Sequence, residues 1–251
     1  MLDMAALRQL IEKLTYRPLF VTVSGAHLYG FPSPDSDVDL RGTHLLPLRD
    51  VIGLDLPNQT VERKLDLSGT EVELVSHDLG KYLGLLVKNN GYVLEQIFSP
   101  LVVMGQGFLD ELRPLARRCI TRHHYHHYRG FLATQRKLLD KQEAKITKTI
   151  LYAYRVLLTG IHLLRTVEVE SNLPRLAHEY QRPFLTDLIA QKREEKGQSP
   201  HLDWSFHDAQ LRELEDRLDK AYQESGLPDE RDRRAVNEFL IRWRLGEAGS
   251  R

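Results

Sequence analysis

The sequence lacks several features that mark secreted and membrane proteins. Its 251 residues include one cysteine, Cys119, so it can form neither an internal disulfide nor a multi-cysteine metal site. No uncharged apolar run reaches the roughly 18 residues of a membrane-spanning helix, and residues 1–14 carry charges where a signal peptide is apolar. The 35 basic and 35 acidic residues cancel, so net charge favours neither a nucleic-acid nor a membrane partner. We therefore expect a cytoplasmic protein with no membrane partner.

The first hundred residues have the hydrophobic pattern of a mixed α/β domain. Apolar residues at helical spacing predict a helix over 2–14. A short β-rich apolar run predicts a buried strand at 19–23, and extended or alternating patterns predict strands at 38–46, 60–67 and 70–75. The connection between the first two strands is rich in Gly, Pro, Ser and Asp, which indicates a loop.

After residue 78 the period becomes helical, with two short helices before a break at Ser99 and Pro100. A last apolar run at 101–104 precedes a stretch that is helical throughout. We therefore predict an α+β protein, in which a domain at 1–106 with a mixed sheet flanked by helices is followed by an all-helical domain at 107–251. Helices of the second domain are expected over 108–118, 121–139, 143–168, 183–195, 206–224 and 230–245.

The charges are segregated along the chain. Residues 113–165 hold twelve Lys and Arg against two acids, whereas 35–73 hold nine acids and four bases, and 203–238 hold eleven acids and six bases. One interpretation is that metal and phosphate meet between an acidic α/β part and basic helices. The other is that these charges are the solvated faces of helices packed against acidic neighbours.

The most informative motif lies around the first two predicted strands. Asp37 and Asp39 are separated by one apolar residue in a predicted strand, so both carboxylates project from one face while Val38 points to the core. Paired carboxylates repel each other, and a hard cation such as Mg²⁺ turns that repulsion into coordination. Gly25, after the buried first strand, lets the backbone approach a phosphate closely, and Ser24 adds a hydroxyl donor.

A two-metal phosphoryl-transfer site usually needs a further carboxylate. Glu71 and Glu73 are candidates, because they share one face of a later predicted strand. An isolated Asp-x-Asp is common by chance and is often a surface turn. The ordered combination of strand, Ser-Gly, loop, paired acids and later acid is far more specific.

This combination resembles the nucleotidyltransferase superfamily of DNA polymerase β. The closer resemblance is to its bacterial and phage branch, the predicted nucleotidyltransferases of the RNA-repair-pathway polymerase-like family. Three stretches carry it, of which only the first is specific by itself: 24–30 with 34–42, then 81–100, and more weakly 148–158. The resemblance spans about residues 20–165, and none is claimed from Pro174 onward.

The resemblance implies transfer of a nucleoside monophosphate from an NTP to an acceptor hydroxyl, with release of pyrophosphate. The implied acceptor is an RNA 3′ end, and the implied cofactor is Mg²⁺ or Mn²⁺, as two ions. Asp37 and Asp39 would bridge both ions and Glu73 would hold the second. Relatives carry the third acid shortly before the helix that holds Lys81, which favours Glu73 over Glu71.

The same resemblance implies a set of nucleotide-binding residues. Ser24 and the Gly25 amide would grip the β and γ phosphates. Tyr152 would stack on a base or simply fill a helix interface. The cations expected around the triphosphate, each of which could equally be a surface charge, are Arg41, Lys81, Lys148 and Arg155.

Two alternatives to an enzyme that acts on RNA stay open. The acceptor could be a small molecule or a protein hydroxyl, or the chain could be a non-catalytic module that binds NTP or RNA.

The His-rich stretch 123–127 could hold a metal through histidines three or four positions apart, face RNA, or pack as an ordinary helix.

Overall fold

The computed structural model describes residues 2–141, 146–194 and 202–248. The chain divides into two compact units, which we treat separately. Unit 1 comprises Met1–Gly25, Asp37–Cys119 and Glu230–Arg251, and unit 2 comprises Ala26–Ser36 and Ile120–Asp229. Among the described residues no helix is long and apolar enough to cross a membrane.

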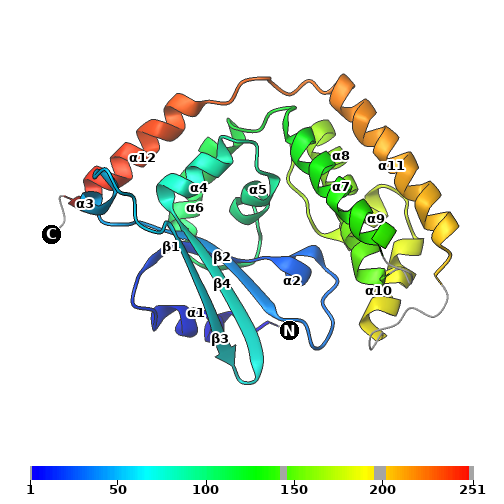
Figure 1. Cartoon of the computed structure of the whole chain (residues 1–251), viewed down its shortest axis with the longest axis horizontal. Coiled ribbons are helices and arrows are strands. Elements are labelled where there is room, and N and C mark those ends of the chain that lie inside the picture. Colours follow the sequence, from blue (N-terminus) through cyan, green and yellow to red (C-terminus); the bar gives the residue numbers. More distant parts are fainter. Residues whose placement is uncertain (1, 142–145, 195–201, 249–251) are drawn as a thin grey trace. The chain divides into compact units, whose positions relative to one another are not determined.

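Unit 1 is built on a mixed five-stranded sheet with the order β3-β4-β2-β1-β5 (Figure 1). Strands β2 and β4 are parallel, and the other neighbouring pairs are antiparallel. The strands are β1 (Pro18–Val23), β2 (Val38–His44), β3 (Thr60–Leu67), β4 (Thr70–Asp78) and β5 (Val102–Met104).

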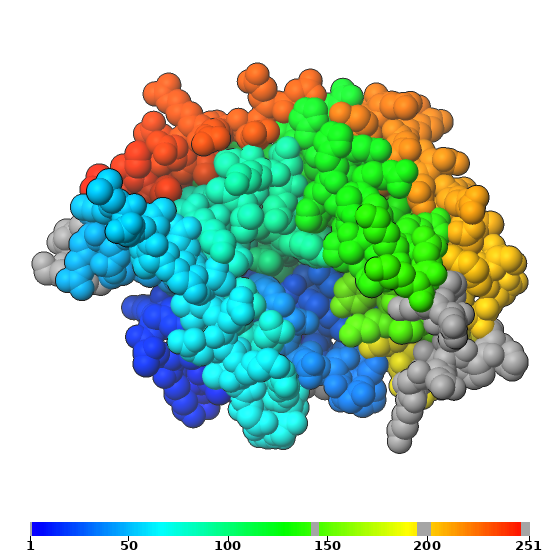
Figure 2. All heavy atoms as spheres, viewed as in Figure 1, coloured from blue at the N-terminus to red at the C-terminus, as the bar shows by residue number. Residues whose placement is uncertain are grey.

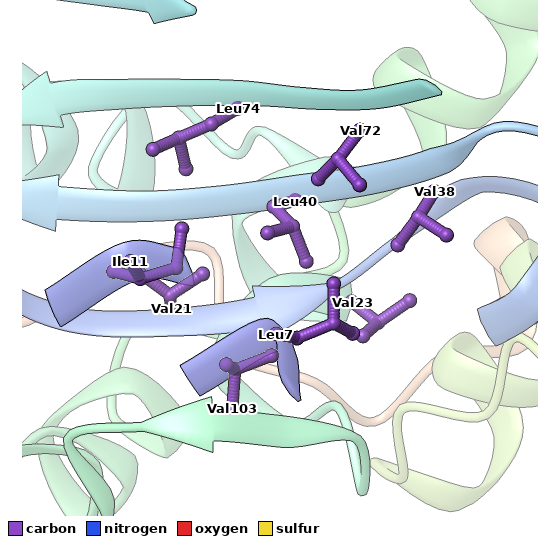
Figure 3. Packing of buried hydrophobic residues seen from close by; sticks show 9 residues of the cluster. All are labelled: Leu7, Ile11, Val21, Val23, Val38, Leu40, Val72, Leu74 and Val103. Carbon is purple, nitrogen blue, oxygen red and sulfur yellow. The ribbon is translucent and has the colours of Figure 1, made fainter. Parts of the chain in front are cut away.

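One face of the sheet packs against helix α1 (Met4–Glu12), whose first turn is capped by Asp3. Alternate residues of β1, β2 and β4 point to this face, as the period of two requires. Figure 3 shows the resulting core, in which helix and strand side chains are almost fully buried. Its members are Leu7, Ile11, Val21, Val23, Val38, Leu40, Val72, Leu74 and Val103.

The opposite face carries helices α4 (Leu79–Leu86), α5 (Gly91–Ile97) and α6 (Gln106–Arg117). Phe20 of β1 contacts Tyr82 of α4 and Phe108 of α6, with ring centroids 5.5 and 5.9 Å apart. The acids Asp39 and Glu73 alternate with core residues along their strands, so they lie on this second face.

Unit 1 also includes the last helix, α12 (Arg233–Ala248), which packs beside α4 and the short helix α3 (Leu48–Val51). In Figure 2 its orange and red atoms lie directly against the cyan and teal atoms of these segments. Trp243 packs edge-on against Phe108, and Arg244 forms an ion pair with the buried Asp78. Residues from the end of the chain thus help to complete the sheet-containing unit.

Unit 2 is helical and centres on α8, whose inward residues are almost all buried. Helices α7, α9, α10 and α11 pack around α8, and the segment 26–36, which contains most of α2, belongs to the same unit. The helices are α2 (Gly25–Tyr29), α7 (His124–Lys141), α8 (Thr147–Thr166), α9 (Leu173–Glu179), α10 (Phe184–Glu194) and α11 (Trp204–Glu224).

The predicted α+β class, a mixed sheet with helices followed by a helical region, is confirmed. The two compact units do not follow the expected boundary at residue 106. Helix α6 stays with the sheet because Phe108 packs on Phe20, and α12 returns to the same unit. The chain leaves unit 1 after Gly25 and re-enters it at Asp37.

Candidate active site

The parallel pairing of β2 with β4 brings two of the predicted acids together. Asp39 and Glu73 are direct partners in the register, and Val38 and Val72 precede them as core residues. Directly paired residues of neighbouring strands project their side chains from the same face. Asp37 is exposed immediately before β2 begins, so all three predicted acids lie at the same end of this strand pair.

The register distinguishes the two candidates for the third acid. Glu73 lies opposite Asp39, whereas Glu71 is exposed and accepts a hydrogen bond of 2.8 Å from Lys64 of β3. The same hydrogen bond raises the pKa of Lys64. Glu73 is therefore the acid placed beside Asp39, and Glu71 has a counter-ion on the outer strand.

The turn after β1 is built around the Asp39 carboxylate. The backbone N–H of Ser24 donates to the Asp39 carbonyl at 2.8 Å. Gly25 has a φ of +61°, and a Cβ atom at this position would lie 1.9 Å from Asp39 Oδ2. Only glycine avoids both the left-handed strain and this overlap. The Ser24-Gly25 pair and the acid pair thus form one structural feature.

Arg41 lies among the acids. Its guanidinium is 2.9 Å from Asp39 Oδ1 and 3.9 Å from Glu73 Oε1. One nitrogen of the group also donates to the carbonyls of Leu40 and Glu73, at 3.0 and 3.4 Å. The predicted phosphate-binding cation is thus an ion-pair partner of two predicted metal ligands.

Lys81 lies at the other end of the strands. Its ammonium donates to Thr60, which is paired with His77 near the end of β4. That position is four residues beyond Glu73, or about 13 Å along a strand. Burial, with a smaller contribution from Lys81, lowers the pKa of His77. The structure does not bring Lys81 to the acid pair.

The remaining predicted nucleotide-binding residues are on α8 of unit 2. Arg155 is fully buried, with its guanidinium 4.1 Å from the ring centre of Tyr29. Tyr152 packs edge-on against Tyr29 and Phe31, at 5.7 and 5.5 Å. Lys148 is exposed in the first turn of α8. Two of these three residues therefore pack within their unit, and one is open to solvent.

Sequence reasoning missed two cations of α10 that contact the segment 26–36. Lys192 donates to the Phe31 carbonyl at 3.1 Å and to Ser33 Oγ at 2.5 Å, and Arg193 donates to the Gly30 carbonyl. Burial and the nearby charge of Lys148 lower the pKa of Lys192. These contacts join residues about 160 positions apart, and adjacent bases near a helix end are too common to indicate them.

Much of the basic stretch is paired with acids of its own unit. Arg129 and Arg136 of α7 both bind Glu215 of α11, and Arg136 also binds Asp208. Arg122 lies 3.6 Å from Asp229. For these residues the structure matches the second interpretation, that of basic helices packed against acidic neighbours.

The His-rich stretch packs as a helix start. His124 is buried and hydrogen-bonded to Thr121, while Tyr125 stacks on Tyr222 of α11 with ring centroids 4.4 Å apart. Within the described ranges, no three or more His, Cys, Asp or Glu side chains are already arranged as a metal-binding group. At the acid pair, the Arg41 guanidinium lies 2.9 Å from the Asp39 carboxylate and 3.9 Å from that of Glu73. The donors present there are all carboxylate oxygens, which suit Mg²⁺ or Mn²⁺.

The chain is similar to a known protein family and to a known protein. The family model of the RNA repair pathway DNA polymerase beta family matches residues 2–242. The chain is also 32% identical, over 218 residues, to an uncharacterized protein of Methanocaldococcus jannaschii. That alignment covers 85% of this chain and 88% of the relative. Both matches extend well beyond the stretch of about 145 residues on which the motif resemblance rests.

Proposed function

Because the chain belongs to the RNA repair pathway DNA polymerase beta family, we propose that it transfers a nucleoside monophosphate from an NTP to the 3′ hydroxyl of an RNA. The observation that carries this proposal is the in-register pair of Asp39 and Glu73, with the Ser24-Gly25 turn built onto Asp39. Family membership supports the nucleotidyltransfer, and the RNA 3′ end is our inference from the family's description.

In the proposed reaction the acceptor oxygen attacks the α-phosphorus and the bond from that phosphorus to the bridging oxygen breaks. Pyrophosphate leaves with the bond electrons, and the hydroxyl proton passes to solvent. Asp37, Asp39 and Glu73 would hold Mg²⁺ or Mn²⁺, as two ions. Bound metal would lower the pKa of the acceptor hydroxyl and offset charge on the triphosphate.

The other site residues would bind and orient the nucleotide. The Ser24 hydroxyl and the Gly25 N–H would donate to phosphate oxygens, where charge grows as pyrophosphate leaves. Lys81 and the exposed Lys148 stay proposed phosphate-binding cations. Tyr152 and Arg155 pack against Tyr29, so we propose that they act by fixing the segment 26–36.

A second candidate keeps the chemistry but changes the acceptor to a small molecule or a protein hydroxyl. It is favoured by the pairing of Arg129 and Arg136 with α11, which leaves less positive charge for an RNA backbone. A module that binds NTP or RNA without turnover is the third possibility.

The test is label transfer from each α-labelled NTP, with Mg²⁺ or Mn²⁺, to RNA, to small alcohols and to added protein. We expect label in RNA with the wild type and a loss of at least about 100-fold for Asp39→Asn, because a metal ligand is removed. The matched control is Asp55→Asn, the same chemical change in an exposed loop, which should retain full activity.

Each outcome distinguishes the candidates. Label found in a small alcohol or in protein, and not in RNA, would show that the acceptor is that molecule. Binding of NTP with no transfer to any acceptor would refute the enzymatic proposal and leave the binding module.

A further inference from the structure

Both carboxylate oxygens of Asp39, a proposed metal ligand, lie against groups of the protein itself. Asp39 Oδ1 binds the Arg41 guanidinium at 2.9 Å. Asp39 Oδ2 lies against Gly25, so closely that a Cβ atom there would overlap it. In this arrangement the carboxylate therefore faces a cation of the protein and a backbone surface.

The guanidinium is held more firmly than a surface ion pair. Besides the two carboxylates, it donates to the carbonyls of Leu40 and Glu73. Its side chain is 25% exposed and that of Asp39 is 30% exposed, whereas the nearby pair of Lys64 and Glu71 is 75% and 47% exposed. Four contacts to two neighbouring strands fix the planar group in one position.

Two carboxylates in register repel each other unless a cation lies between them. The Arg41 guanidinium is such a cation, 2.9 Å from Asp39 and 3.9 Å from Glu73. A divalent ion bound to the same carboxylates would repel the guanidinium at short range, so both cannot keep their full set of contacts with Asp39.

We propose that Arg41 is the resident counter-ion of Asp39 and Glu73, and that it releases Asp39 when a divalent metal ion binds. This inference rests on the proposed function, since it assigns Arg41 a role in metal loading. The exchange makes Arg41 a positioning residue that keeps the acids in place and weakens metal binding when no nucleotide is present. The released guanidinium carries its charge to the phosphates of the incoming NTP.

The test measures Mn²⁺ binding to the full chain without nucleotide, by the electron paramagnetic resonance signal of free Mn²⁺. Arg41→Gln should bind Mn²⁺ about tenfold more tightly than the wild type, within the usual range of coupling between two ligands. Arg41→Lys keeps the charge but loses the planar fork, so its affinity should be intermediate. The matched control is Arg49→Gln, which removes one exposed positive charge beside Asp50 of α3 and should change Mn²⁺ affinity by at most about twofold.

A second readout is the melting temperature with and without Mn²⁺. Arg41→Gln should melt lower than the wild type without metal and gain more from added metal, because metal replaces the missing counter-ion. Equal or weaker Mn²⁺ binding by Arg41→Gln, or a change no larger than that of Arg49→Gln, would overturn the inference alone. Mn²⁺ binding that is unchanged by Asp39→Asn, or the absence of binding by both the wild type and Arg41→Gln, would refute the proposed metal site as well.

Discussion

Gly25 is the residue at which the turn and the acid pair depend on each other. Its φ of +61° and the closeness of Asp39 Oδ2 both exclude a side chain. We expect Gly25→Ala to displace the Asp39 carboxylate, to cost about 1–3 kcal/mol of stability, and to reduce Mn²⁺ affinity and nucleotidyl transfer together.

The control for this variant is Gly84→Ala in α4, where an added Cβ meets nothing within 4 Å. That change should raise stability by about 0.5–1 kcal/mol, because alanine favours the helix. Denaturant unfolding and Mn²⁺ titration of both variants check the prediction. Unchanged metal binding in Gly25→Ala would show that the turn does not support Asp39.

His127 is predicted to make the stability of unit 2 depend on pH. Burial, with smaller contributions from His124 and Arg155, lowers the pKa of His127 to about 4, against about 6.5 in the unfolded chain. The unfolded state therefore binds more protons below pH 6.5, so stability is full above that pH and falls as the pH drops toward 4. The loss at pH 5 is about 2 kcal/mol relative to pH 8.

Unfolding measured from pH 8 to pH 5 should thus show a shallower pH dependence for His127→Gln than for the wild type. His126→Gln is the control, since His126 is exposed and next in the sequence. Equal pH profiles for the wild type and His127→Gln would contradict the assignment.

At the scale of elements, α12 is secured to unit 1 by a buried charge pair. Arg244 donates to Asp78 at 2.6 Å, and the Asp78 side chain is fully buried while it also caps α4 through the Gly80 N–H. Removing one partner leaves an uncompensated buried charge. We expect Arg244→Met to cost about 3–5 kcal/mol of unfolding free energy.

The matched control is Arg242→Gln, two residues earlier in the same helix, whose pair with Glu111 is exposed. It should change stability by less than about 1 kcal/mol. The comparison is made by denaturant unfolding of the full chain. Similar small losses for both variants would show that the pair of Arg244 and Asp78 does not secure α12 to unit 1.

Most elements could be predicted from the sequence, because their patterns are long and periodic. The strand at 19–23 and the alternation at 70–75 appear in the structure as β1 and β4. The short helices α2, α3 and α9 were missed, since four to seven residues are too few for a helical period. Helix α9 instead begins at a local signal, Asn172 as cap followed by Pro174.

Site residues that follow from strand alternation could be predicted from the sequence. The contacts that these residues make with distant parts of the chain could not. Period-two spacing within each strand is enough to single out Asp37 and Asp39, but it leaves both Glu71 and Glu73 as candidates for the third acid. The choice of Glu73 rests on the family resemblance, and the function of all these acids stays a prediction. The contact of Arg41 with Asp39 and the contacts of Lys192 depend on tertiary geometry, which no local pattern encodes.

At the scale of the whole molecule, family membership is confirmed. The nature of the acceptor then depends on how many of the basic residues already pair with groups of the protein itself. Of the twelve basic residues in 113–165, the structure describes eleven, and seven of these interact with groups of the protein itself. Asp208, Glu215 and the other acids of α11 account for part of this pairing. The seven are Arg113, Arg117, Arg118, Arg122, Arg129, Arg136 and Arg155.

This pairing predicts the salt dependence of RNA binding. Twelve phosphate contacts would give a slope of log K against log salt near about −8 for single-stranded RNA, whereas four or five contacts give about −3. We expect the shallower slope in fluorescence anisotropy with labelled RNA between 50 and 300 mM KCl.

The variant Lys148→Gln should reduce the size of this slope by about 0.7, because Lys148 is exposed. Arg136→Gln should leave the slope unchanged and lower stability, because Arg136 already binds Asp208 and Glu215. A slope near −8 would mean that the pairs with α11 open to bind RNA, and a slope near zero would favour a small or neutral acceptor.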